Sequence, residues 1–273
     1  MAMYIVADIG GTKMRIAGTA TLDRFKDPVI LNTPESYEEG IALIIKTIRQ
    51  ISQGEDVEAI AMGLAGVLVN GRRSLVHSNV TDWNGRSIAD DIEEAFPTRV
   101  LLENDTALVG LGEAVFGAGT GSRLLMYMTV STGVNAVRIV NGSIDKATLG
   151  FETGDQYLFV DGAPGQLGDL ISGKAVSLRY GVHPRELGQD SPVWEELAHL
   201  TSYGIYNSIV HWSPDRVVLG GSMFNKIGIP IDTIRKTLEE INVKYPSIPE
   251  VVHSSLGDLG GLYGGLARLR QLQ

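Results

Sequence analysis

The stretch Asp8-Ile9-Gly10-Gly11-Thr12-Lys13 separates two apolar segments near the start of the chain. Residues 3–7 before it and residues 14–20 after it are rich in β-prone side chains, so they predict two strands joined by a glycine-rich turn. Glycine lets backbone N–H groups approach an anion closely, and threonine adds a hydroxyl donor. The turn is therefore suited to bind a phosphate group.

Two later turns have the same character. Ser131-Thr132-Gly133 follows the apolar segment 124–130, and Gly220-Gly221-Ser222 follows the apolar residues 217–219. Each turn alone could simply reverse the chain without binding anything. Three such turns after three apolar strands together favour a phosphate-binding protein. None of them matches GxxxxGK[ST] or GxGxxG, so neither the P-loop nor the protein-kinase template applies.

The segment around the second turn repeats residue types of the first. Met3, Tyr4, Gly10, Arg15 and Ile16 recur as Met126, Tyr127, Gly133, Arg138 and Ile139, always 123 positions later and in the same strand, turn, strand context. A repeat of this length predicts two similar domains.

The rest of the chain alternates between helical and strand patterns, which predicts an α/β protein. Strands are expected at residues 59–66 and 99–105. Helices are expected at residues 38–52, 87–96, 106–119, 169–181, 192–212, 231–242 and 257–272.

Asp8 stands at the end of an apolar strand, where a buried carboxylate needs a partner. Mg²⁺ commonly takes only one or two protein carboxylates, keeps several waters and bridges nucleotide phosphates. Asp8 beside the first glycine-rich turn is therefore a candidate magnesium ligand. A local cap or ion pair is the alternative.

Two other segments carry carboxylates in turns. Glu103-Asn104-Asp105-Thr106 lies between a strand and a helix, where a carboxylate could accept a proton from a hydroxyl that attacks a phosphate. The same residue types are also common helix caps, so capping remains open. Glu152, between Gly150 and Gly154, could hydrogen-bond vicinal sugar hydroxyls, and a solvated turn is its alternative.

Composition excludes several classes of protein. The 273 residues carry a net charge of −9, which opposes binding to nucleic acid, and they include no cysteine, which excludes disulfides and cysteine-ligated zinc. The chain has no GxSxG nucleophile motif and no paired histidine metal motif. No signal peptide or run of about 18 apolar residues is present, so we expect a cytoplasmic protein with no membrane partner.

Seven segments occur in an order that resembles the ROK kinases and the related bacterial glucokinases. They are DIGGTKMR, GLAG, SNVTDWNG, ENDTALVGLGE, STGV followed by VNG, GFETGDQ, and VVLGGS. The resemblance spans nearly the whole chain, and DIGGTK and ENDxxxxxLGE are its most specific parts. It implies an actin-like (ribonuclease H-like) fold in which duplicated mixed sheets are flanked by helices. The implied domains are residues 1–113 plus 258–273, the smaller, and residues 114–257, the larger.

The resemblance also implies roles for individual residues. Asp105 would be the catalytic base on the 6-hydroxyl of a sugar, and Asp8 would bind Mg²⁺. The implied sugar-binding residues are Gly66, Asn79, Asn104, Asp105, Glu152 and Asp155. The implied ATP-binding residues are Asp8, Gly10, Gly11, Thr12, Lys13, Thr132, Gly133, Gly220 and Gly221.

The chain departs from the family pattern at three places. Asp155 stands where the family has a sugar-contacting histidine, and the second phosphate turn reads STGVNAV rather than GTGVGGG. The zinc cluster CxCGxxGC of many members is missing, so no zinc is expected.

The main hypothesis is an ATP-dependent hexose kinase of glucokinase type that acts on glucose or a related hexose or N-acetylhexosamine. Its partners would be the sugar, ATP and a second copy in a homodimer. A non-catalytic sugar- or nucleotide-binding protein with the same fold is the first alternative. An actin-like filament protein or ATPase is the second.

Overall fold

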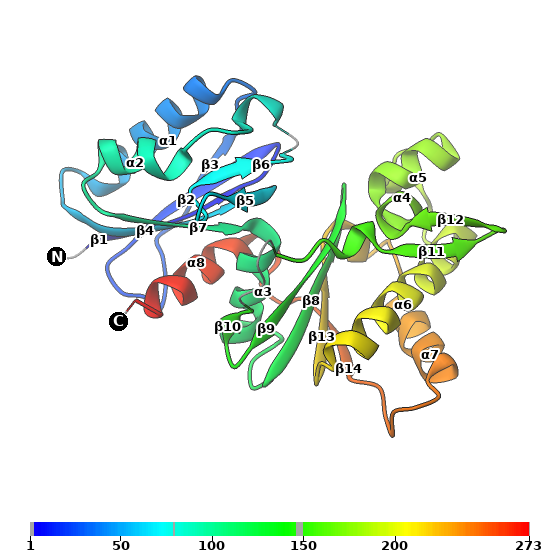
Figure 1. Ribbon diagram of the computed structural model, residues 1–273. Coiled ribbons are helices and arrows are strands. Elements are labelled where there is room, and N and C mark those ends of the chain that lie inside the picture. Colours follow the sequence, from blue (N-terminus) through cyan, green and yellow to red (C-terminus); the bar gives the residue numbers. More distant parts are fainter. Residues whose placement is uncertain (1–2, 79, 146–149, 273) are drawn as a thin grey trace. The chain divides into compact units, whose positions relative to one another are not determined.

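A glycine-rich hairpin begins the chain, as predicted. The structure, a computed structural model, describes residues 3–78, 80–145 and 150–272. In it β1 (Met3–Ile9) and β2 (Lys13–Thr19) pair antiparallel (Figure 1). The turn between them holds the two glycines of the DIGGTK stretch. The prediction of a strand, a glycine-rich turn and a returning strand is therefore confirmed.

The chain forms two units, each with a mixed sheet of five strands. Unit 1 comprises Met1–Val115, Lys146–Gly150 and Asp258–Gln273. Unit 2 comprises Phe116–Asp145 and Phe151–Gly257.

The sheet of unit 1 has the order β3-β2-β1-β4-β7. Its other strands are β3 (Val29–Asn32), β4 (Val57–Leu64) and β7 (Arg99–Asn104). Strand β2 runs antiparallel to its neighbours β3 and β1, whereas β1, β4 and β7 are parallel to one another. The carboxyl ends of the three parallel strands therefore meet at one edge of the sheet.

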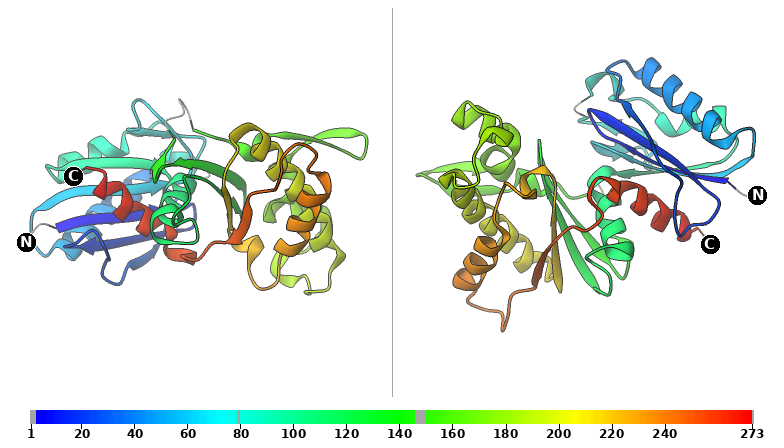
Figure 2. Two further views of the ribbon diagram at one scale, coloured as in Figure 1. Left: turned by 90° about the horizontal axis from the view of Figure 1, so that it is seen from below. Right: turned by 180° about the vertical axis from the view of Figure 1, so that it is seen from behind.

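Helices cover both faces of this sheet. Figure 2 shows α1 (Tyr37–Ser52) and α2 (Ile88–Ala95) on one face and α8 (Gly260–Arg270) on the other. On the first face, Ile44 and Ile48 of α1 pack with Ile60 and Met62 of β4 in a fully buried core. Such side chains each contribute about 1.5–3 kcal/mol on burial, so the helical spacing of the isoleucines explains why α1 forms here.

Helix α8 packs against β1 and β4. The end of the chain thus completes the unit that contains its beginning. Helix α3 (Asp105–Phe116) starts directly at the end of β7.

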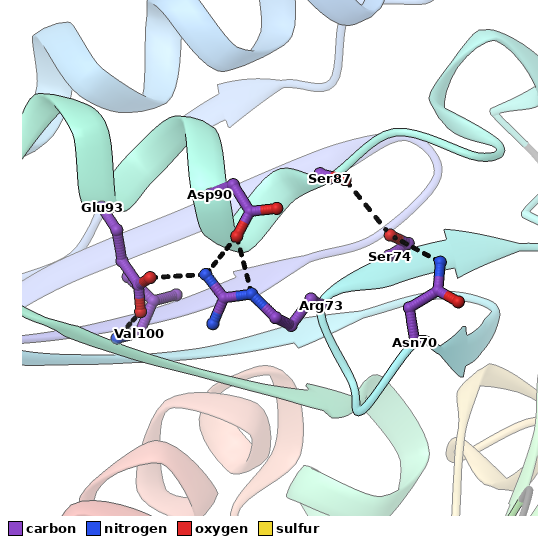
Figure 3. A network of polar contacts seen from close by, with 7 residues as sticks. All are labelled: Asn70, Arg73, Ser74, Ser87, Asp90, Glu93 and Val100. Carbon is purple, nitrogen blue, oxygen red and sulfur yellow. Dashed lines mark hydrogen bonds and ion pairs between the residues drawn. The ribbon is translucent and has the colours of Figure 1, made fainter.

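A small hairpin of β5 (Val67–Val69) and β6 (Ser74–Val76) follows β4 and is tied to helix α2. Arg73, at its turn, donates through Nε to Asp90 Oδ1 at 2.6 Å and also ion-pairs with Glu93 (Figure 3). Glu93 in turn accepts a hydrogen bond from the backbone N–H of Val100 at 3.1 Å. The Arg73 pairing holds the pKa of the Glu93 carboxyl below its usual range. Arg73 therefore connects the hairpin to α2, and Glu93 connects α2 to β7.

The sheet of unit 2 repeats the topology of the first. Its strands β8 (Leu124–Val130), β9 (Val134–Val140), β10 (Ser143–Ile144), β13 (Arg216–Gly220) and β14 (Glu250–His253) have the order β10-β9-β8-β13-β14. Strand β9 runs antiparallel to its neighbours β10 and β8, and β8, β13 and β14 are parallel to one another. The duplicated mixed sheets predicted from the sequence are confirmed.

The residue-by-residue register of the predicted repeat is wrong. Ile9 pairs with Met14 at the end of the first hairpin, and Val130 pairs with Val134 at the end of the second. Ile9 and Val130 are 121 positions apart rather than 123, and Met14 and Val134 are 120 apart because the second turn is shorter by one residue. The five identities therefore do not occupy equivalent positions, although the two hairpins do.

Unit 2 contains the remaining helices and a second small hairpin. They are β11 (Tyr157–Val160), β12 (Ala163–Gln166), α4 (Leu167–Ile171), α5 (Gly173–Tyr180), α6 (Pro192–Trp212) and α7 (Ile231–Ile241). The single helix predicted over residues 169–181 is wrong. Ser172 has an extended backbone and caps α5 by accepting the Ala175 N–H at 3.1 Å, so it separates α4 from α5.

The core of unit 2 lies between its sheet and helices α6 and α7. Met126, Val217 and Leu219 of the sheet pack there with Leu197 and Ile234 of the helices, and all five are fully buried. Among the described residues, no helix combines the length and apolar character needed to cross a membrane.

Candidate functional site

The carboxyl edge of the unit 1 sheet gathers most of the predicted residues of that unit. Strand pairing aligns Asp8 of β1 with Gly63 of β4, and Gly63 with Glu103 of β7. Asp105 begins α3 just beyond this row. Ligands of open α/β sheets bind outside the carboxyl ends of parallel strands. The register therefore places two carboxylates, Asp8 and Asp105, where such a sheet offers a site.

Gly63 separates these two carboxylates. A Cβ added to Gly63 would lie 3.6 Å from Asp8 Oδ1 and 3.4 Å from Asp105 Cα. On its other side Asp8 meets Gly261 of α8, where an added Cβ would lie only 2.6 Å from Asp8 Cγ. The lack of a side chain at both glycines lets the chain pack this closely around the Asp8 carboxylate.

Burial, together with the neighbouring Asp105, raises the pKa of Asp8 to about 7. Arg15 opposes both effects, because its Nη1 atom lies 4.0 Å from Asp8 Oδ2. Arg15 also donates through Nη2 to Asp258 Oδ2 at 3.1 Å. The arginine is thus shared between two carboxylates, and it neutralises Asp8 only in part. A further cation beside Asp8 would favour its ionised form.

Asp8 fits a metal that is held mainly by phosphate and water. Among the described residues, no group of three or more His, Cys, Asp or Glu side chains could bind a metal ion by itself. A Mg²⁺ ion that arrives with nucleotide phosphates needs only one or two protein carboxylates. The incompletely neutralised Asp8 meets that requirement.

The stability of the protein free of metal and nucleotide should fall between about pH 4 and pH 7. The folded-state pKa of Asp8 is raised from its ordinary value of 3.8 to about 7, so the stabilising protonated form is lost as the pH rises through 7. We expect Asp8→Asn to exceed the wild type in free energy of unfolding by about 4 kcal/mol at pH 8. The difference should shrink towards pH 4. Urea unfolding from pH 4 to 8 tests this, and a difference independent of pH would contradict it.

Asp105 and Asn104 have different local roles at the start of α3. Asp105 Oδ1 accepts the Thr106 N–H at 2.6 Å. Burial raises the pKa of Asp105, and the hydrogen bonds from Thr106 oppose that rise. Asn104 Oδ1 accepts the Ala107 N–H at 3.1 Å, so Asn104 caps the helix. The capping alternative applies to Asn104, and the Asp105 carboxylate retains acceptor capacity towards a ligand.

Gly66 is connected to this helix start. Asn104 Nδ2 donates to the Gly66 carbonyl at 3.0 Å. Gly66 has a φ of 143°, and an added Cβ would lie 2.8 Å from Leu75 Cδ1, so both backbone conformation and space require glycine. Asn79, the other predicted sugar-binding residue of unit 1, lies outside the described residues.

The β1–β2 turn presents its exposed residues next to the segment that contains Gly66. The Gly10 N–H donates to the Lys13 carbonyl at 3.0 Å, and the Thr33 hydroxyl donates to the Gly10 carbonyl at 2.6 Å. Gly11, Thr12 and Lys13 are exposed at this turn. Gly10 and Gly11 also line a narrow cavity of about 10 Å³ with Ala65 and Ser78. The predicted phosphate turn and the predicted sugar-binding segment are therefore neighbours.

Three segments converge in unit 2 around the second predicted phosphate turn. The Ser131 N–H donates to the Gly133 carbonyl at 2.8 Å, which closes the β8–β9 turn. The Ser131 carbonyl accepts the Gly173 N–H of α5 at 2.7 Å. Gly221, at the end of β13, has a φ of 94°, and an added Cβ would lie 2.4 Å from the Val130 carbonyl oxygen. Only glycine fits at this crossing.

A cavity of about 650 Å³ opens beside this crossing, within the size range of small-molecule sites. Its lining includes the hydroxyls of Ser131, Thr132, Ser177 and Ser222, the cations Lys174, Arg185 and Lys226, and the apolar side chains of Met223 and Ile227. Among the described residues that line it there is no carboxylate. Hydroxyls, cations and an apolar surface suit a ligand that combines phosphates with an aromatic ring.

The segment with Glu152 and Asp155 lies against strand β9. Glu152 precedes the 3-10 turn Thr153–Asp155, and both carboxylates are exposed. Glu152 Oε2 accepts a hydrogen bond from Asn135 Nδ2 of β9 at 3.2 Å. Within unit 2 the structure thus brings Glu152 next to the strand that follows Thr132 and Gly133.

Several residues at these sites were missed by the sequence analysis. Arg15 is the partner of Asp8, Gly261 touches its carboxylate, and Asn135 holds Glu152. The buried Glu103, two residues before Asp105, pairs with Arg72 and accepts Arg268 Nε at 2.9 Å. Arg15 and Glu103 had a local signal, each as a charged residue in an apolar strand. The others depend on contacts between distant parts of the sequence.

Known proteins resemble this chain over its full length. The glucokinase of Streptomyces coelicolor is 24% identical, with 99% of this chain and 98% of that protein covered. The N-acetyl-D-glucosamine kinase of Citrobacter koseri is also 24% identical, with 96% and 97% covered. A crystal structure of a ROK family glucokinase from Streptomyces griseus in complex with glucose and AMPPNP is 25% identical. It matches with a TM-score of 0.80 and covers 99% of this chain and 100% of that one.

These similarities agree with the duplicated sheets and with the order of the sequence motifs. The α/β fold of the actin-like sugar kinases, expected from the sequence, is therefore confirmed. The family model described as the ROK family matches residues 4–271. The chain belongs to the ROK family.

Proposed function

We propose that this protein is an ATP-dependent sugar kinase that transfers the γ-phosphate to the 6-hydroxyl of glucose or of a related hexose or N-acetylhexosamine. The observation that carries the proposal is the pair Asp8 and Asp105 on either side of Gly63, at the carboxyl edge of the unit 1 sheet. The β1–β2 turn, which is the first predicted phosphate turn, adjoins this edge. One carboxylate for a metal–nucleotide complex and one for an acceptor hydroxyl are the groups that this reaction needs.

In the proposed reaction Asp105 accepts the proton of the 6-hydroxyl while that oxygen attacks the γ-phosphorus. A bond forms between the sugar oxygen and phosphorus, the bond from phosphorus to the bridging oxygen breaks, and ADP leaves. The pKa of Asp105 is raised by burial, which makes its carboxylate a stronger base than a solvated aspartate. Its hydrogen bond from the Thr106 N–H holds one carboxylate oxygen in place and leaves the other for the hydroxyl.

The donor would use residues from all three predicted phosphate turns. Gly10, Gly11, Thr12 and Lys13 would contact its phosphates in unit 1. Thr132, Gly133, Gly220 and Gly221 would shape its site in unit 2, where the cavity of about 650 Å³ lies. Mg²⁺, which Asp8 would hold, supplies positive charge to the β- and γ-phosphates when it is bound.

The acceptor sugar would be held by Gly66, Asn104 and Asp105 of unit 1 and by Glu152 and Asp155 of unit 2. Asn79 remains a prediction from the family resemblance. The Asn104 carbonyl oxygen caps α3 and one Nδ2 hydrogen is donated to the Gly66 carbonyl, so its contribution to sugar binding would come from the second Nδ2 hydrogen. Asp155 can only accept hydrogen bonds when ionised, whereas a histidine could also donate. This difference should alter the preference among sugars.

A non-catalytic binding protein is the alternative, and Asp155 together with the STGVNAV turn favours it. Purified protein with Mg-ATP, incubated separately with glucose, fructose, mannose, N-acetylglucosamine and N-acetylmannosamine, distinguishes the two. We expect at least one sugar to stimulate ADP release well above the rate without sugar. Sugar or nucleotide binding by calorimetry without any turnover would support the alternative. A lack of sugar binding and of turnover would refute both.

A further inference from the structure

Asn135 connects the second phosphate turn to the segment with Glu152, and no sequence motif indicated this. Its Nδ2 donates to Glu152 Oε2 at 3.2 Å. Its Oδ1 accepts the Thr153 N–H at 3.1 Å and the Ala136 N–H at 2.7 Å. Both ends of the amide are used, so the orientation of the side chain is determined by its partners.

The segment is also packed directly against the strand. A Cβ added to Gly154 would lie 2.2 Å from the Val134 carbonyl oxygen, so the turn touches β9 at the residue before Asn135. At its far end, Gln156 Nε2 donates to the Thr153 carbonyl at 2.9 Å, and Asn207 Nδ2 of α6 donates to Gln156 Oε1 at 3.0 Å. The backbone of the segment is therefore held at two places, and only Asn135 also holds the Glu152 side chain among these contacts.

We propose that Asn135 is a positioning residue that orients the Glu152 carboxylate for hydrogen bonds with hydroxyls of the acceptor sugar. The inference rests on the proposed function. An exposed glutamate has several rotamers, and ordering it on binding has an entropic cost. A hydrogen bond to one oxygen restricts those rotamers beforehand, and a carboxylate has further acceptor positions with which to bind sugar hydroxyls. Because Asn135 is two residues after Gly133, the sugar contact is anchored to the strand that carries the phosphate turn.

The experiment measures the dissociation constant of the best sugar by calorimetry, so that it does not depend on turnover. Asn135→Ala should raise this constant about threefold to tenfold, the value of one hydrogen bond. Asn135→Asp retains an acceptor for the Thr153 N–H but places a negative charge beside Glu152. We expect it to weaken sugar binding at least as much as alanine does. The dissociation constant of a non-hydrolysable ATP analogue should stay within twofold in both variants.

Two controls separate orientation of Glu152 from general loosening of the segment. Asn207→Ala removes the contact at the far end without touching Glu152, and it should leave sugar affinity within twofold. In a Glu152→Ala background, Asn135→Ala should have no further effect, because Asn135 would then have no carboxylate to orient.

Each outcome is informative. An unchanged sugar affinity in Asn135→Ala, an equal loss in Asn207→Ala, or a full additional loss in the Glu152→Ala background would overturn the inference while the proposed function stands. A wild-type protein that binds none of the sugars would refute the proposed function and, with it, a role for Asn135 in sugar binding.

Discussion

Asp105→Asn should lower kcat for sugar phosphorylation about 10²–10⁴-fold, the usual contribution of a general base. Asparagine keeps the size of the side chain, and its carbonyl oxygen can still accept the Thr106 N–H, so the start of α3 should be preserved. It cannot take the proton of the 6-hydroxyl. The KM for the sugar should change much less than kcat, because most ground-state contacts remain. Steady-state kinetics with Mg-ATP and the best sugar measure both constants.

Asp161→Asn is the matched control for this variant. Asp161 is exposed in the β11–β12 turn with a φ of 53°, a conformation that asparagine adopts readily. The substitution Asp161→Asn makes the same chemical change in unit 2. We expect kcat and the KM for the sugar to stay within twofold of the wild-type values. An Asp105→Asn enzyme as active as the wild type would eliminate Asp105 as the base.

Gly264→Ala should destabilise the protein by about 3 kcal/mol, at the upper end of the usual effect of overpacking. An added Cβ at Gly264 of α8 would lie 1.8 Å from the Leu108 carbonyl oxygen of α3. Gly112 of α3 meets α8 from the opposite side, with its added Cβ 2.5 Å from the Gly260 carbonyl oxygen. The obstacle in both cases is backbone, which cannot turn aside as a side chain can. The two helices must therefore separate.

Urea unfolding of Gly264→Ala measures this loss. Alanine alone favours a helix over glycine by about 1 kcal/mol, so the packing conflict has to exceed that gain. Gly188→Ala is the control, because an added Cβ there has no atom within 4 Å, and its stability should stay within about 0.5 kcal/mol of wild type. A Gly264→Ala protein as stable as the wild type would show that α3 and α8 can separate without penalty. Because α3 begins with Asp105, we also expect reduced activity.

Most regular elements could be predicted because their signals are local. The apolar spacing of α1 and the unbroken apolar run of β4 each identify one element without reference to the rest of the chain. Short strands such as β3, β5, β6 and β14 were not predicted. Strands of three or four residues have too little pattern of their own, and they form because a neighbouring strand offers backbone partners.

The break between α4 and α5 at Ser172 also depends on a contact with a distant part of the chain, so it was not predicted. The residues on both sides favour a helix, and serine followed by glycine gave only a weak signal for a boundary. In the structure the Gly173 N–H donates to the Ser131 carbonyl, a residue more than 40 positions away in the sequence. That hydrogen bond aligns the start of α5 with the β8–β9 turn, and no local pattern contains it.

The DIGGTK stretch at residues 8–13 illustrates what the sequence by itself determined. Together with the other ordered motifs it indicated a resemblance to the ROK family, which implied the duplicated α/β sheets, and it identified Asp8 and Asp105 as the candidate carboxylates. These inferences depend on residue identity and spacing along the chain.

The tertiary structure decided the surroundings of those carboxylates. Parallel pairing aligned Asp8, Gly63 and Glu103, and α8 brought Gly261 against Asp8 from the far end of the chain. Burial and the neighbouring Asp105 then raised the pKa of Asp8 to about 7, against the lowering effect of Arg15. The pKa of a group depends on its solvation and on charges a few ångströms away. Those distances exist only once the chain has folded.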